Sequence, residues 1–145
     1  MNQIKIDTGL IEIPIVRDGV DVGTISFNPN DVSFVSRFYE LIGILEKKER
    51  EIKLKQTAIE KDQSVDKYGI PANAFKKIKL NDELCDFMNA EFDKVFGQGT
   101  CSVLFGNTKN PNLYYVFIEQ LLPLVKSVRE TKLSSYLGEK TEVLE

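Results

Sequence analysis

The spacing of apolar residues changes once along this chain, and that change limits the fold more than any other feature of the sequence. Ile11, Ile13 and Ile15 alternate with a polar residue or proline, which is the period of a half-buried strand. After residues 28–31 (Asn-Pro-Asn-Asp) the apolar residues recur every three or four positions, which is the helical period. This order predicts an α+β fold, mostly helical, in which a short β unit precedes the helices.

The β unit is expected to be a hairpin within residues 3–27. Asp18-Gly19 marks its turn, because glycine accepts the positive φ that tight hairpin turns require. In the second strand the apolar positions change from even to odd numbers around Gly23, which favours a β-bulge there. Residues 4–7 could add a short third strand.

One long helix is predicted for residues 31–61, and its two halves differ. The first half is rich in apolar residues, which indicates burial on a broad face. Most residues of the second half are charged, and only a thin apolar row continues through Leu45, Ile52 and Ile59, which recur at intervals of seven. Such a row is narrower than the apolar face of a helix that packs onto a core.

Two interpretations of this row remain open. The second half could be a solvated helix supported by Glu–Lys pairs four residues apart. Alternatively, the row could be a docking surface for another copy of the chain or for a partner protein. The binding hypothesis names Leu45, Ile52 and Ile59 as partner-binding residues.

The remaining chain is predicted to hold two further amphipathic helices. A connector over residues 62–80, interrupted by glycine and proline, is expected to lead into a helix at residues 81–96. A third helix follows at 111–129, after an asparagine that suits the cap position and a proline that suits the first turn. Residues 1–130 would then form a single domain, and 131–145 a polar, loosely ordered tail.

No catalytic, cofactor-binding or metal site is predicted. The chain has no histidine, the commonest general base and metal ligand. Cys85 and Cys101 are expected to be separate, inert thiols, and neither Cys101 nor Ser102 has a base at a suitable spacing. The glycine-rich segment 97–106 lacks the spacing of dinucleotide- and phosphate-binding loops. We therefore do not expect an enzyme.

Charge and hydropathy also limit the partners. The net charge of −3 favours neither nucleic acid nor an anionic membrane. No stretch of about eighteen apolar residues is present, and the first residues lack the pattern of a signal peptide, so a cytoplasmic location is expected. An acidic chain of mixed charge with a thin apolar row fits a protein that acts by binding other proteins.

Three segments resemble a known family. They are residues 25–34 (Ile-Ser-Phe-Asn-Pro-Asn-Asp-Val-Ser-Phe), 92–100 (Phe-Asp-Lys-Val-Phe-Gly-Gln-Gly-Thr) and 104–107 (Leu-Phe-Gly-Asn). Together with the closing amphipathic helix they are similar to tail assembly chaperones of long-tailed bacteriophages from Gram-positive hosts. The resemblance covers roughly residues 20–130, and its motifs are structural, with Phe96 and Phe105 as expected core residues.

The resemblance implies a function, a location and partners. Such chaperones keep the long tape measure protein in solution and help to recruit tail tube subunits in the cytoplasm of the bacterial host, and some self-associate. A longer form often arises by ribosomal frameshifting. Two other functions share the same profile: a structural or adaptor protein of a phage particle, and a small regulatory protein that inhibits a host protein by binding.

Overall fold

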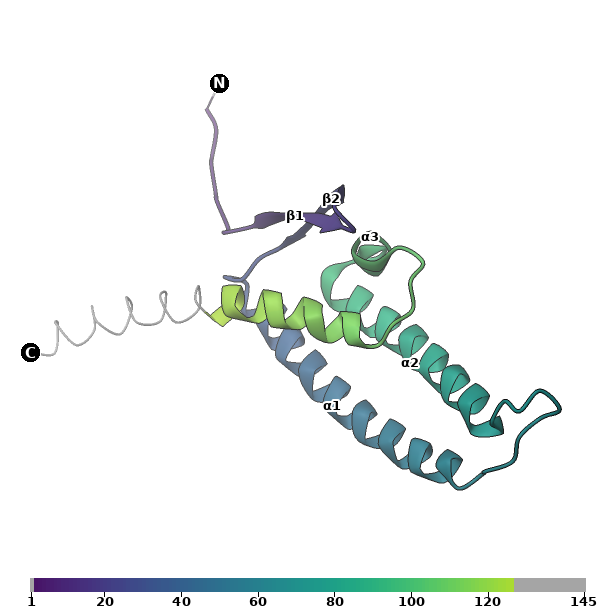
Figure 1. Cartoon of the computed structure of the whole chain (residues 1–145). Helices are drawn as coiled ribbons and strands as arrows, with labels where there is room; N and C mark the ends of the chain where they lie inside the picture. The colour runs from purple at the N-terminus through teal and green to yellow at the C-terminus, as the bar shows by residue number, and fades with distance from the viewer. Residues whose placement is uncertain (1, 127–145) are drawn as a thin grey trace, which may run out of the picture.

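A two-stranded antiparallel hairpin precedes the helices, as the change in periodicity predicted, and the fold is α+β and mostly helical (Figure 1). The computed structural model describes residues 2–126. Strands β1 (Ile11–Arg17) and β2 (Val20–Phe27) are joined by Asp18 and Gly19, whose φ angles of 53° and 78° are both positive. Two consecutive positive φ angles define the type I′ turn, whose twist matches that of the paired strands.

The predicted bulge lies beside Gly23. Ile15 pairs with Gly23, but Val16 pairs with Asp21, so Val22 is an extra residue in β2. Gly23 has a φ of 138°, which side chains rarely permit. The extra residue shifts the alternation of side chains in β2 by one position, so Ile25 and Phe27 lie on the buried face of the hairpin.

The suggested third strand is absent: residues 2–10 form no strand and extend beyond β1. Thr8 and Gly9 do not turn the chain back, because the Asn28 side-chain amide donates to the Thr8 carbonyl and hydroxyl at 3.1 Å each. Gly9 lies against Asn30 so closely that a Cβ would collide with its amide group. We call residues 2–10 the arm; it leads away from the body in Figure 1.

Helix α1 (Val32–Glu60) agrees with the predicted long helix. Its N-cap is Asp31, whose carboxylate accepts from the Ser33 amide at 3.0 Å. Its charged half includes the expected pair four residues apart between Glu49 and Lys53, at 3.3 Å.

Helix α2 (Ala72–Phe96) begins at Ala72, so the predicted connector over 62–80 was wrong. Pro71 occupies the cap position, and the Ala72 amide donates to the Ser64 carbonyl at 2.9 Å, so the loop satisfies a donor of the first turn. Two lysines near the start of α2 form ion pairs with residues at and just after the end of α1. Lys76 pairs with Asp62 and Lys77 pairs with Glu60, each at 2.9 Å.

Because α2 starts early, it runs antiparallel to α1 along the charged half (Figure 1). Leu45 and Ile52 are only 2% and 6% exposed and belong to the same core as Leu80 and Leu84 of α2. Ile59 is half-buried against that core. The interpretation of this row as an exposed docking surface was wrong, because its partner is α2 of the same chain.

The predicted closing helix is present over residues 112–126. At its start, the side-chain oxygen of Asn110 accepts a hydrogen bond from the Asn112 amide at 3.0 Å. Residues 127–129 of the prediction, and the predicted tail 131–145, lie outside the described residues. The glycine-rich segment contains a short helix, α3 (Thr100–Phe105), that the sequence did not predict. Aromatic rings from the hairpin and every helix meet in one cluster: Phe27, Phe34, Phe38, Phe92, Phe96, Phe105, Tyr114 and Phe117.

Within residues 2–126, no helix is long and apolar enough to cross a membrane. The same residues contain no cluster of acidic or cysteine side chains that could hold a metal ion.

Candidate functional site

An open groove of about 640 Å³ lies between β1 and helix 112–126, with the α3 region closing one side. We call it the hairpin groove. Its lining is mainly apolar and comes from these three elements and from Ile25 of β2: Ile13, Ile15, Ile25, Leu104, Phe105, Leu113, Val116, Phe117, Leu121 and Leu124. Apolar surface arranged in a concavity is the usual basis for binding another protein's side chains.

The periodicities of the two elements produce the two walls. Ile13 and Ile15 are two residues apart on β1 and therefore project on the same face of the hairpin. Val116 and Leu124 lie on the groove side of their helix and stay 45% and 43% exposed, although the same helix buries Phe117. The apolar face of that helix is therefore wider than the part that packs onto the core.

The rim of the groove is polar. Thr108, Asn110 and Gln120 line it and offer side-chain donors and acceptors to a guest backbone. Arg17 and Asp18 lie at the end of β1 and add one charge of each sign. A guest segment would thus meet apolar walls and polar edges.

Arg17 fixes the hairpin against α3. Its guanidinium donates to the Val103 carbonyl at 2.7 Å and to the Ser102 carbonyl at 3.3 Å. These carbonyls belong to the last turn of α3, where positive charge is favourable. Gly106, with a φ of 60°, makes room for the guanidinium, because a Cβ there would lie 3.0 Å from Arg17 Cζ. The Phe-Gly of segment 104–107 is therefore structural.

Segment 92–100 also has a structural role. The Asp93 carboxylate accepts from the amides of Gly99, at 3.3 Å, and Cys101, at 3.0 Å, and so caps α3 from the end of α2. Gly97 and Gly99 turn the chain between the two helices with φ angles of 115° and 86°. This segment holds α3, and through it one side of the hairpin groove.

The two thiols lie in the core and away from the groove. Cys85 and Cys101 are free and buried, and burial raises the pKa of both; the Asp93 carboxylate raises that of Cys101 further. The Tyr114 hydroxyl, also buried, is within hydrogen-bonding distance of the Cys85 carbonyl, at 3.2 Å, and of Asn89 Oδ1. Protonated thiols in such surroundings are poor nucleophiles.

The sequence-predicted partner-binding residues do not line this groove. Leu45, Ile52 and Ile59 all lie in or against the core between α1 and α2. The sequence reasoning missed the groove itself, although two signals were present: the alternation at Ile13 and Ile15, and the wide apolar face of the closing helix.

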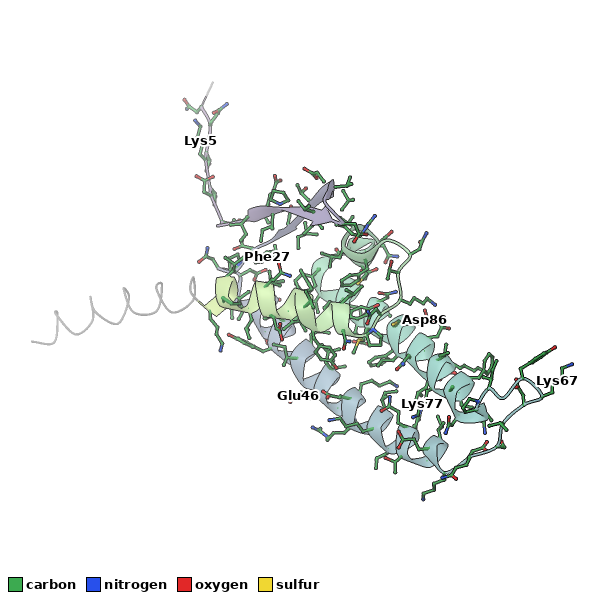
Figure 2. All side chains as sticks on the ribbon, in the orientation of Figure 1. Lys5, Phe27, Glu46, Lys67, Lys77 and Asp86 are labelled. Atoms are coloured by element: carbon green, nitrogen blue, oxygen red, sulfur yellow. The ribbon has the colours of Figure 1, made fainter. Side chains whose placement is uncertain are left out.

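A second group of exposed apolar side chains lies at the other end of the molecule, around the loop between α1 and α2. It includes Leu54, Val65, Tyr68, Ile70, Phe75 and Ile78. Figure 2 shows Lys67 of that loop at the opposite end from Lys5 of the arm. None of these residues lines the hairpin groove.

Comparison with known proteins gives one family. A family described as "Family of unknown function (DUF6673)" matches residues 19–142. The chain belongs to this family. The DUF6673 match includes Asp93, Gly106 and the helical wall of the hairpin groove, whereas β1 and the arm precede it. No curated protein and no solved structure matches the chain.

Proposed function

We propose that this protein binds apolar segments of other proteins in the hairpin groove and acts as a phage tail assembly chaperone. The observation that carries the binding proposal is the groove itself: about 640 Å³, apolar walls, and Val116 and Leu124 left partly exposed. The resemblance of residues 25–34, 92–100 and 104–107 to tail assembly chaperones supports the choice of clients. These are the tape measure protein and, during assembly, tail tube subunits.

The energetics of such a groove suit a reversible chaperone. Full burial of one leucine-sized side chain contributes about 1.5–3 kcal/mol. Three such anchors would contribute roughly 5–9 kcal/mol, against an association cost of about 4–15 kcal/mol. A single segment would therefore bind weakly and exchange readily, whereas a long client with many apolar segments would hold many copies at once.

The charged exterior supports the same role. Ion pairs such as Lys77 with Glu60 and Lys109 with Asp82 and Asp86 cover the helical pair with both signs of charge. A complex coated with such surfaces presents charge to water in place of the client's apolar segments, which would otherwise aggregate.

Coexpression with the tape measure protein encoded in the same gene cluster tests the proposal. The wild-type chain should increase the soluble fraction of that protein, and Val116→Asp with Leu124→Asp should abolish the increase. Leu54→Asp is the control: it places a carboxylate at an exposed apolar position outside the groove and should behave as wild type.

Three results would count against this function. A tape measure protein that stays equally insoluble with and without the chain refutes the chaperone role. Full activity of the Val116→Asp, Leu124→Asp variant refutes the groove as its site. Recovery of the chain from purified virions would favour the structural or adaptor function instead.

A further inference from the structure

The arm presents apolar side chains that its own body does not cover. Ile4 and Ile6 are 91% and 78% exposed, and Leu10 is exposed as well. Ile4 and Ile6 are two residues apart on extended chain, so they project on the same side, with Lys5 on the other. Figure 2 shows Lys5 well away from the hairpin and the helices. Burial of two isoleucines would contribute about 3–6 kcal/mol, which favours a partner surface for this segment.

The direction of the arm is fixed at its root. Thr8 is held beside Asn28 by two hydrogen bonds of 3.1 Å, and Gly9 fits against Asn30. Because Asn28 follows β2, these contacts hold the root of the arm at the open end of the hairpin, and from there the arm leads away from β1 (Figure 1). The hairpin groove lies in the opposite direction, along residues 13–18. The arm would have to fold back at its root to enter the groove of its own chain.

The arm and the groove match in length and in chemistry. Residues 2–7 span about 20 Å when extended. The helical wall from Leu113 to Leu124 spans about 17 Å. The groove offers apolar walls to Ile4 and Ile6, and the carboxylate of Asp18 at its end can pair with Lys5 of an entering arm.

We infer that the arm of one copy occupies the hairpin groove of a second copy. The contact depends mainly on side chains, because Pro14 in β1 lacks an amide donor and interrupts any strand added along that edge. If each copy both gives and receives an arm, the contact closes as a symmetric dimer. Combined with the proposed function, on which this consequence rests, the arm shields the groove until a client displaces it.

Two complementary variants test the contact. The arm variant carries Ile4→Asp and Ile6→Asp; the groove variant carries Val116→Asp and Leu124→Asp. Each should sediment as a monomer of 16.5 kDa, whereas the wild type should show a concentration-dependent rise toward twice that mass. An equimolar mixture of the two variants should associate again, because one supplies the intact groove and the other the intact arm. Leu54→Asp should associate as wild type.

Several results would overturn the inference. They are a wild-type chain that stays monomeric at several hundred micromolar, an arm variant that still associates, and a mixture that does not recover. All five positions are exposed or half-exposed, and an unchanged circular dichroism spectrum would exclude misfolding as the cause of a lost contact.

A crosslink gives an independent measurement. A chain with Ile6→Cys mixed with a chain with Val116→Cys should form an intermolecular disulfide under mild oxidation, while Leu54→Cys in place of Val116→Cys should not. Equal crosslinking by both would refute the contact.

The two proposals fail separately. If only the arm contact is wrong, the wild type remains monomeric but still keeps the tape measure protein soluble through the groove. If only the chaperone role is wrong, the complementary variants still restore association while the tape measure protein stays insoluble.

Discussion

Ile52→Ala is the most informative single change for the fold, because it distinguishes a core row from a surface row. Ile52 is 6% exposed, in the core that α1 shares with α2. The substitution removes three carbon atoms. At about 0.8 kcal/mol for each buried methylene, the lost transfer free energy is about 2.4 kcal/mol. Incomplete collapse of the resulting cavity adds to this, so we expect the free energy of unfolding to fall by about 2–4 kcal/mol.

Urea denaturation followed by circular dichroism measures this loss. The midpoint should move to lower urea while the slope stays constant, since the unfolded chain is scarcely changed. Leu54→Ala, two residues along the same helix but 75% exposed, should shift the free energy of unfolding by no more than about 0.5 kcal/mol. If Ile52→Ala behaves like Leu54→Ala, the row is not core and the packing described for α1 and α2 is wrong.

Three further predictions concern groups outside the row formed by Leu45, Ile52 and Ile59. Cys85 and Cys101 should not react with a thiol reagent at pH 8 in the native protein and should both react in urea, because burial raises the pKa of each; rapid native reaction would contradict their burial. Asp93→Ala should cost about 0.5–2 kcal/mol of stability in urea, because α3 loses its cap, and an unchanged midpoint would show that the cap is unimportant. The hydrogen bond from Lys76 lowers the pKa of Asp62 well below its usual value, so the pair stabilises the fold above the usual carboxylate pKa. This stabilisation is lost progressively as pH falls from the usual carboxylate pKa to the lowered one, and the loss has begun by pH 3. Lys76→Met should therefore lose less stability between pH 7 and pH 3 than wild type, and an equal loss would contradict the pairing.

Local chemistry made the hairpin and α1 predictable from the sequence. The Asp18-Gly19 turn, the change of phase at Gly23 and the polar residues 28–31 before α1 each act within a few residues, although it is Asp31 that caps the helix. Such signals leave the backbone few alternatives, and tertiary contacts confirm them without changing them.

One error at the start of α2 caused the larger mistake. The sequence pattern places Pro71 inside a connector, but proline is also compatible with the start of a helix, and Pro71 directly precedes α2. With α2 expected to begin at Asn81, the row through Ile52 and Ile59 has no helix of its own chain to pack against, so the sequence leaves both a solvated helix and a docking surface open. Contacts between Lys76 and Asp62, far apart in sequence, hold the early turns of α2, and no local pattern shows them.

The hairpin groove was hidden for a different reason. It depends on how β1 sits against helix 112–126, about a hundred residues later, and on Arg17 reaching the end of α3. Apolar residues such as Val116 and Leu124 look like ordinary core positions in a helical pattern. Only the packed fold shows that they remain partly exposed.

The proposed function depends on the binding of apolar protein segments in the hairpin groove. The most direct test is to add an amphipathic peptide from the tape measure protein to the isotope-labelled chain and follow methyl resonances by NMR. We expect the shifts to concentrate on Ile13, Ile15, Leu113, Val116 and Leu124, with little change at Leu54 and Ile78. Shifts confined to the loop between α1 and α2, or no saturable shifts at millimolar peptide, would contradict it.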